Sequence, residues 1–274
     1  DHPYLHLEHR RPRQMCISDR SAAAGCVGVG GAGAAMPQEY RLYLDTETDA
    51  LLETVGYTSG PQLFYSSQSE RWCEYQEALQ RLRVTVAVAW RTDEDAPRVY
   101  VGPEFEEVEG LPEGVEVGFA GLLASMAGAA QICAWNAGFD LGVLAKYAPG
   151  GRRGATAASW ARRTFDPMLS LSEVTGRYVG LAVVAEHNLG MGKGADGAQA
   201  VRWWQRGQWE PLVEYCRRDV EVLRRVVECD NLWVPLRLNE ARRALEHTLL
   251  REKPRSTRSV GVQTTAEYEP SLEL

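Results

Sequence analysis

The sequence lacks any apolar run long enough to cross a bilayer. Its most apolar stretches, 119–135 and 179–185, are interrupted by glycine or polar residues, whereas a transmembrane helix needs about 20 predominantly apolar residues in a row. The opening residues, DHPYLHLEHRRPRQ, also lack the apolar core of a signal peptide. We therefore expect a soluble, intracellular protein that has no membrane partner.

Close pairs of cysteine are absent as well. The six cysteines are widely spaced along the 274 residues, whereas structural zinc sites and dithiol redox motifs need cysteines a few residues apart. Cys133 lies in an apolar run and Cys216 in an expected helix, where a buried thiol usually acts as a small apolar side chain. The cysteines are therefore assigned no chemistry.

Positive charge is scarce. The chain has 30 Lys and Arg residues against 37 Asp and Glu residues, with a formal net charge of −7 and a pI near 5.4. Because phosphate neutralisation supplies most non-specific affinity for nucleic acid, this balance argues against a protein that coats nucleic acid with a broad basic face. An enzyme that holds one strand end through divalent cations stays possible, since its site is acidic at the centre.

Both ends of the chain differ in composition from the middle. Residues 1–38 combine a basic start with a Gly/Ala stretch that has no periodicity, and residues 251–274 are rich in Ser, Thr, Glu and Pro. We expect two disordered tails, because neither segment carries enough large apolar residues to form a core. Residues 39–250 are long enough for one catalytic domain.

Within that domain, apolar patterning predicts antiparallel strands followed by alternating helices and strands. A strand is expected at 40–45, and strands at 82–90 and 98–103 form a hairpin across the turn TDEDAP. The later expected elements are a helix at 118–128, a strand at 130–135, a helix at 138–148, a strand at 162–167, and helices at 168–174, 179–189, 195–206 and 209–229. This order predicts an α/β fold with a mixed β-sheet flanked by α-helices.

Two acids, Asp45 and Glu47, stand two residues apart where the first strand is expected to end. Alternate residues of a strand point to the same face, so both carboxylates can bind one cation. An acid-x-acid pattern after a strand is also typical of a polar loop. For the pair taken alone, both interpretations stay open.

Further candidates follow in WNAGFD and YCRRD. Asp140 falls in the first turn of an expected helix, where the helix dipole favours a carboxylate with or without a function, and Asn136 fits a helix cap. Tyr215 and Asp219 are four residues apart on an expected helix and therefore share a face. Each spacing is common when it occurs singly.

Together, the three motifs form an ordered set: D-x-E in LYLDTETD, N-x-x-x-D in AWNAGFD and Y-x-x-x-D in YCRRD, over about 40–227. The set resembles the DEDD 3′ to 5′ exonuclease superfamily, whose relatives include polymerase proofreading domains and ribonuclease D. Glu214 stands where the histidine subtype has its His, so the resemblance is to the tyrosine subtype. It implies a ribonuclease H-like fold and a metal-dependent 3′ to 5′ exonuclease.

The same resemblance implies a role for each residue. Two Mg²⁺ or Mn²⁺ ions would be bound, with Asp45 bridging both, Glu47 and Asp219 at the ion of the attacking water, and Asp140 at the other ion. Tyr215 would orient the water. The residues implied near the substrate are Thr46, Thr48, Asn136 and Lys193, and the auxiliary residues are Asp166 and His187. The implied partner is the 3′ end of DNA or RNA, in single-stranded form.

Some of these residues have a plainer interpretation. Asp166 fits a turn before Pro167 equally well. Trp203, Trp204 and Trp209 are expected in the core, because adjacent tryptophans on a helix cannot both face one groove. The G-x-G-x-x-G pattern at 28–33 does not indicate a dinucleotide site, because no strand and helix flank it.

The competing function is a catalytically silent nucleic-acid-binding or scaffold module of the same fold. An acidic stretch, PEFEEVEGLPEGVEV at 103–117, lies between the first two motifs. It would repel a phosphate backbone if it faced the substrate groove. We therefore expect this stretch to face away from the site or to hinder the entry of duplexes.

Overall fold

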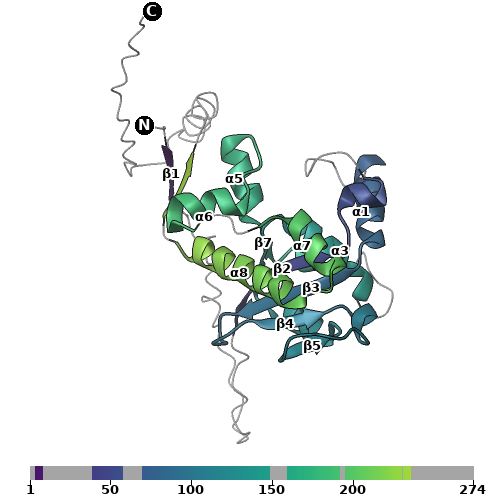
Figure 1. Ribbon diagram of the computed structural model, residues 1–274. Helices are drawn as coiled ribbons and strands as arrows, with labels where there is room; N and C mark the ends of the chain where they lie inside the picture. Colours follow the sequence, from purple (N-terminus) through teal and green to yellow (C-terminus); the bar gives the residue numbers. More distant parts are fainter. Residues whose placement is uncertain are drawn as a thin grey trace, which may run out of the picture.

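A computed structural model of the chain describes residues 4–8, 39–57, 70–148, 159–191, 195–229 and 231–235. Within these residues, six strands form one mixed sheet and two more strands form a separate small sheet (Figure 1). The large sheet is flanked by helices, which confirms the predicted α/β class with a mixed sheet.

The large sheet has the order β5-β4-β3-β2-β6-β7. Strands β2, β3 and β4 form an antiparallel meander, β6 and β7 continue the sheet parallel to β2, and β5 lies parallel to β4 at the other edge. The strands are β2 (Arg41–Thr48), β3 (Val84–Arg91), β4 (Arg98–Val101), β5 (Val115–Val117), β6 (Gln131–Cys133) and β7 (Thr164–Phe165). Strand β2 therefore lies inside the sheet, between β3 and β6.

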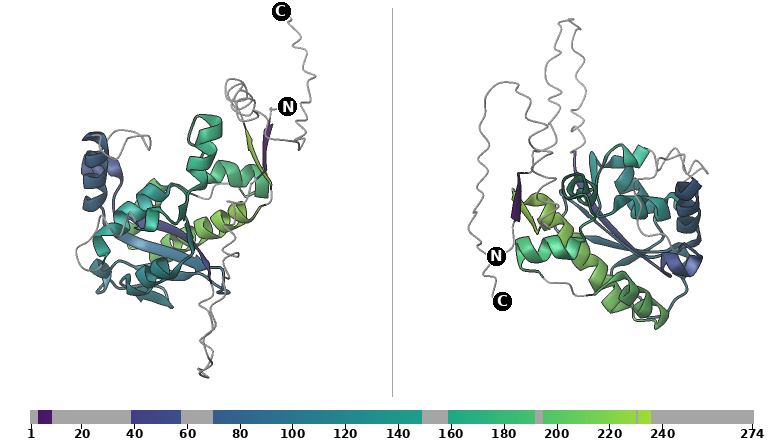
Figure 2. Two further views of the ribbon diagram at one scale, coloured as in Figure 1. Left: turned by 180° about the vertical axis from the view of Figure 1, so that it is seen from behind. Right: turned by 90° about the horizontal axis from the view of Figure 1, so that it is seen from above.

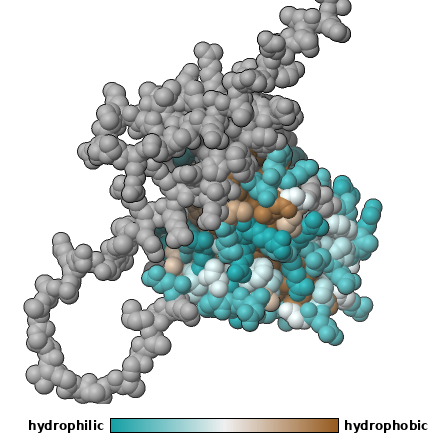
Figure 3. All heavy atoms as spheres, turned by 90° about the vertical axis from the view of Figure 1, so that its left-hand side faces the viewer, coloured by the Kyte–Doolittle hydropathy of each residue, from teal (hydrophilic) through white to brown (hydrophobic). Residues whose placement is uncertain are grey.

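Side chains of β2 alternate between two separate cores. Leu42 and Leu44 pack with helices α1 (Glu70–Arg81), α2 (Ala120–Gly128) and α3 (Ala137–Leu144). Tyr43 points to the other face, where it packs with α7 (Gly197–Gln205) and α8 (Trp209–Glu228). The sheet lies between these two layers of helices (Figure 2). The part of the surface that carries hydropathy colours in Figure 3 is mostly hydrophilic, as expected once the apolar residues are buried.

A third apolar cluster joins the C-terminal helices to the small sheet. Leu232 and Val234 of β8 (Asn231–Pro235) pack with Val184 of α6 (Leu181–Leu189) and with Val222 and Val226 of α8. Strand β1 (Tyr4–Glu8) pairs antiparallel with β8. The segment predicted as a disordered lead thus contains a strand, whose partner lies more than 200 residues along the chain and leaves no local trace in the sequence.

Most predicted elements are found within a few residues of their expected positions. The first strand continues to Thr48, so the D-x-E pair lies within the strand and not at its end. The helix expected at 138–148 stops at Leu144 and is followed by a 3-10 turn. Elements that were not predicted are α1, the strands β1, β5 and β8, and the 3-10 helices η1 (Leu52–Val55), η2 (Pro103–Phe105) and η3 (Ala145–Tyr147). The helix after β7, α5, spans Pro167–Thr175.

The acidic stretch at 103–117 forms η2 and the edge strand β5. Phe105 is buried, and Val108, Leu111 and Val115 pack beside it against the core under α8. The glutamates between these apolar residues, such as Glu107 and Glu109, are exposed. The apolar residues of the stretch therefore pack it against the edge of the sheet, and the glutamates between them stay in solvent.

Among the helices of the described ranges, none combines the length and the apolar character that a bilayer crossing requires.

The turn after β4 depends on the absence of a side chain at Gly102. A Cβ atom there would lie 2.2 Å from the carbonyl oxygen of Val84, and a backbone atom cannot move aside without displacing β3. We predict that Gly102→Ala lowers the free energy of unfolding by roughly 1–3 kcal/mol, as other overpacked sites do. Urea denaturation of the metal-free protein measures this effect.

Gly197→Ala is the control, because its added Cβ would meet nothing within 4 Å and alanine favours the start of α7. Its free energy of unfolding should equal or slightly exceed that of the parent. Equal stability of both variants would contradict the close packing of the turn.

Candidate functional site

Three carboxylates meet between strand β2 and helix α8. Asp45 and Glu47 point from the same face of β2, and Asp219 approaches from α8; one oxygen atom of each lies within 4.8 Å of the others. The pairing of β2 with β3 shifts register between Glu47 and Thr48, an irregularity of the kind that often re-aims side chains next to functional sites. The structure thus brings together three of the predicted metal ligands.

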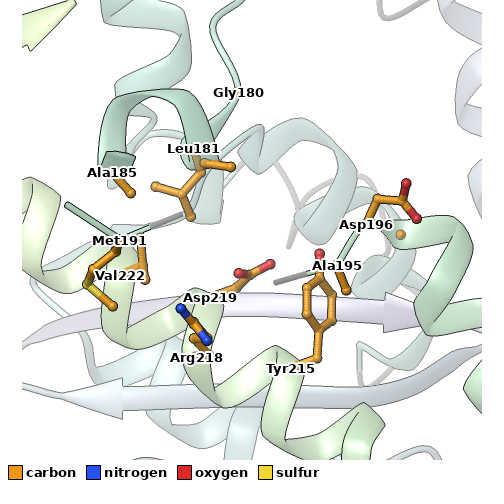
Figure 4. A pocket seen from close by; sticks show the side chains of 12 residues that line it. Gly180, Leu181, Ala185, Met191, Ala195, Asp196, Tyr215, Arg218, Asp219 and Val222 are labelled. Carbon is orange, nitrogen blue, oxygen red and sulfur yellow. The ribbon is translucent and has the colours of Figure 1, made fainter. Parts of the chain in front are cut away.

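Helix α8 supplies two more groups to this site. Tyr215 lies one helical turn before Asp219, and Figure 4 shows both side chains projecting into one pocket. The thiol of Cys216, which is fully buried, donates to Asp45 Oδ2 at 3.3 Å and to the Asp45 carbonyl oxygen at 3.6 Å. Cys216 was not predicted to take part in the site, although its place beside Tyr215 on the same helix was a usable signal.

Asp140 reaches the same strand from the opposite face. Thr46 lies between Asp45 and Glu47 and points toward α3, where its hydroxyl donates to Asp140 Oδ1 at 2.7 Å. Both side chains are buried, with 5% of Thr46 and 3% of Asp140 exposed. The structure therefore places Asp140 at the same strand but outside the three-carboxylate cluster, with Thr46 as its hydrogen-bond partner.

Asp166 caps two helices at once. Its carboxylate accepts hydrogen bonds from the backbone N–H groups of Asn136 and Ala137 at the start of α3, at 3.2 and 2.9 Å. It also accepts one from Met168 at the start of α5, at 3.0 Å. Asp166 therefore fixes the turn that precedes Asp140, which explains its burial without a metal-binding role.

Asn136 occupies the cap position of α3, but its side chain makes no capping hydrogen bond. Its backbone adopts the left-handed conformation, with φ of 65°, which asparagine tolerates better than most residues. Its buried Oδ1 atom has no hydrogen-bond partner within the described part of the chain. The capping interpretation of the Asn136 side chain is therefore wrong, because the Asp166 carboxylate takes that role.

The remaining predicted residues lie away from the carboxylates or outside the described residues. Thr48 is buried and donates its hydroxyl to the carbonyl oxygen of Ala50 at 2.8 Å. His187 is exposed near the end of α6, with Nδ1 2.8 Å from the carbonyl oxygen of Val183. Lys193 lies outside the described residues. Neither Thr48 nor His187 contributes a side chain to the cluster.

All three tryptophans pack at the core, as predicted, with Trp209 buried and Trp203 and Trp204 partly buried. The Trp204 and Trp209 rings lie beside Phe105, with centroid distances of 4.4 and 6.2 Å. Trp203 points elsewhere and contacts the ring of Tyr215 at 5.9 Å. Trp203 therefore packs against Tyr215 of the site. Trp204 and Trp209 pack against Phe105 and so attach the acidic stretch to α7 and α8.

A pocket of about 220 Å³ opens next to the cluster (Figure 4). Tyr215, Arg218 and Asp219 line one part of it, and apolar side chains from α6 and α8, including Leu181 and Val222, line another. The pocket is smaller than the usual 300–1,000 Å³ of drug-sized sites. It provides space for a small group directly beside Asp219.

Burial and mutual repulsion raise the pKa values of the carboxyl groups. The pKa of Asp45 is raised first by burial and then by Glu47, Asp219 and Asp140. The pKa of Glu47 is raised by burial, Asp219 and Asp140. Burial raises the pKa of Asp140 to about 7, although the hydrogen bond from Thr46 acts in the opposite direction.

This donor set fits a divalent cation. Mg²⁺ and Mn²⁺ prefer oxygen ligands, and Mg²⁺ is usually held by a few carboxylates together with water and substrate phosphate. A cation between the carboxylates of Asp45, Glu47 and Asp219 would relieve the repulsion that raises the pKa values of Asp45 and Glu47. The residues present therefore match the chemistry of a magnesium or manganese site.

Comparison with known proteins assigns no family. No protein-family model and no curated protein matches the chain. A chain from the structure of the yeast NOT1 MIF4G domain co-crystallized with CAF1 matches with a TM-score of 0.37 and 12% identity, over 62% of this chain and 80% of that chain. Likeness at this level is too low to define a fold or an activity.

The raised pKa of Asp140 predicts a pH-dependent stability. Its folded-state pKa of about 7 exceeds the unfolded value of about 3.9, so the protonated carboxyl group stabilises the fold. This contribution is complete below about pH 4 and is lost as the pH rises through about 7. We predict that the metal-free parent melts at a lower temperature at about pH 8 than at about pH 5.

Asp140→Asn should reduce this fall in melting temperature, because the amide does not ionise. Divalent cations should raise the melting temperature of the parent more at the higher pH, where the carboxylates are ionised. Calorimetry with EDTA or with Mg²⁺ measures both effects. Identical pH dependence of parent and Asp140→Asn would contradict the raised pKa of Asp140.

Proposed function

We propose that the chain is a metal-dependent 3′ to 5′ exonuclease of ribonuclease H-like fold, acting on single-stranded ends of nucleic acid. The observation that carries the proposal is the meeting of Asp45, Glu47 and Asp219 within 4.8 Å. These three residues come from the D-x-E and Y-x-x-x-D motifs, which are about 170 residues apart in the chain. Asp140 of the remaining motif lies at the same strand and is held by Thr46.

The arrangement of the sheet supports the same proposal. The D-x-E strand, β2, begins an antiparallel meander and receives the parallel strands β6 and β7 on its other side. Asp140 follows β6, and Asp219 lies on α8, which packs against β2 and β3. A central strand that is approached by helices on both faces can hold acids from three motifs around one point.

Asp45, Glu47, Asp219 and Asp140 would hold two Mg²⁺ or Mn²⁺ ions. When bound, a metal pair supplies a hydroxide nucleophile at neutral pH and neutralises charge on the leaving oxygen of an in-line displacement. Asp219 and Tyr215 both line the pocket, so in this proposal the attacked phosphate would lie between the pocket and β2. Arg218 lines the same pocket and offers a cationic contact to the strand.

Tyr215 acts in this scheme as a hydrogen-bonding group and not as a base. Burial, together with the neighbouring Asp219, Glu47 and Asp45 carboxylates, raises its pKa above the ordinary value of 10. The phenol therefore stays protonated at neutral pH and orients water or phosphate through its hydroxyl. The Trp203 ring beside it restricts its movement.

The competing function is a scaffold of the same fold that binds strands without cutting them. Its main support was the acidic stretch at 103–117. That stretch ends in β5, which is separated from β2 by β4 and β3, a distance of about 14 Å at the usual strand spacing. The charges at the β5 end of the stretch are therefore set apart from the carboxylate cluster.

Purified protein incubated with Mn²⁺ or Mg²⁺ and end-labelled DNA or RNA strands tests the proposal. We predict stepwise shortening from the 3′ end, and loss of that activity in the Asp45→Asn, Glu47→Gln double variant, which keeps the side-chain shapes but loses the charges. Asp93→Asn, in the exposed hairpin turn, is the matched control and should retain activity. Tight binding without shortening would favour the scaffold, and release of 5′ nucleotides would contradict the polarity.

Tyr215→Phe separates chemistry from metal binding. The variant keeps the ring that contacts Trp203 but loses the hydroxyl, so kcat should fall on the order of 100-fold, the usual scale for a poorly positioned reacting group. Mn²⁺ affinity should stay close to that of the parent. Tyr147→Phe, whose hydroxyl contacts Glu104, is the control; equal kcat values for the two variants would remove Tyr215 from the reaction.

A further inference from the structure

Thr46 makes a contact that its sequence position alone does not suggest. It stands between the two acids of the D-x-E motif, and strand alternation turns it to the opposite face of β2. There its hydroxyl donates to Asp140 Oδ1 at 2.7 Å, with both side chains buried. The resemblance to exonucleases implied a substrate contact for Thr46, but this hydroxyl is committed to a carboxylate.

The Thr46 hydroxyl links Asp140 to the strand that carries two of the other acids. Asp45 and Glu47 lie on β2, whereas Asp140 lies on α3 and reaches β2 from the other face. A carboxylate on a buried helix can rotate between several orientations, and only some of them present an oxygen to a cation. A short hydrogen bond to one oxygen selects among these orientations.

The chemistry of the partner also matters. A lysine or arginine at this position would orient Asp140 but would neutralise the charge that a cation needs. A hydroxyl orients the carboxylate and leaves its charge in place. Hydrogen-bonding groups behind metal ligands commonly act in this way, and their loss usually costs 10–100-fold in metal affinity or activity.

We propose that Thr46 is a positioning residue for metal binding, whose hydroxyl holds the Asp140 carboxylate in the orientation that a divalent cation requires. This inference rests on the proposed function in one respect, since it takes Asp140 as a metal ligand. It assigns Thr46 a role inside the protein, through Asp140, in place of a direct contact with the strand.

Three variants of the full chain test the inference. Thr46→Val removes the hydroxyl with little change of shape, and Thr46→Ser restores a hydroxyl. Thr85→Val is the matched control: Thr85 is fully buried on the neighbouring strand β3, and its hydroxyl has no hydrogen-bond partner within the described residues. Removing such an unpaired hydroxyl is close to neutral.

Mn²⁺ is the probe, and its binding is measured by calorimetry without any nucleic acid. Thr46→Val should weaken Mn²⁺ binding by about 10–100-fold, and Thr46→Ser should bring it back close to the parent value. Thr85→Val should bind like the parent. In strand-shortening assays at saturating Mn²⁺, Thr46→Val should lower kcat and change KM for the strand little.

Several outcomes would overturn the inference. One is Thr46→Val binding Mn²⁺ as tightly as Thr85→Val; another is Thr46→Ser binding as weakly as Thr46→Val. Circular dichroism checks that each variant is folded, and if Thr46→Val does not fold, Thr46→Ser with parent-like Mn²⁺ binding supports the role while weakened binding contradicts it. A parent that binds Mn²⁺ but shortens no strand overturns only the exonuclease proposal, and a parent that binds no Mn²⁺ overturns both.

Discussion

Four carboxylates lie around the central strand β2 and repel each other. The groups next to them hold the carboxylates in place without neutralising their charge. Asp45, Glu47 and Asp219 meet on one face of β2, and Asp140 approaches from the other. Burial strengthens the repulsion because the interior screens charge less than water does. An arrangement of this kind costs stability in the metal-free protein, which is reflected in the raised pKa values of Asp45 and Glu47. The pKa of Asp140 is raised mainly by burial. The proposed divalent cation would offset this cost by supplying positive charge.

The groups that contact the acids orient them without neutralising them. Cys216 donates to Asp45 and Thr46 donates to Asp140, and neither donor carries a charge. Asp166 adds a second kind of support, because it ties the backbone before Asp140 to the start of α5. The site is thus held by three packed elements, β2, α3 and α8, and metal-binding geometry of this type needs rigid supporting elements.

Local sequence patterns predicted much of the fold and part of the site. The one-sided apolar pattern of α8 and the apolar run of β3 are regular, and both elements were predicted. Helix α1 was missed although Tyr75, Ala78 and Leu79 recur at helical spacing. Strand β5 has only three residues, and β1 pairs with a strand at the far end of the chain, so local pattern reading missed both strands. The D-x-E and Y-x-x-x-D spacings fix which acids share a face. The contacts of Thr46, Cys216 and Asp166 depend on packing between distant segments, which no spacing encodes.

Crystals grown with Mn²⁺ test the metal centre at β2 most directly, because anomalous scattering at the manganese absorption edge locates the ion without reference to activity. The carboxylate cluster predicts a strong anomalous peak bounded by the oxygen atoms of Asp45, Glu47 and Asp219, with a second peak beside Asp140 when a strand end is bound. Crystals of the Asp45→Asn, Glu47→Gln variant should lose the first peak. Manganese that binds only elsewhere on the parent, with the three carboxylates free of metal, would contradict the metal centre.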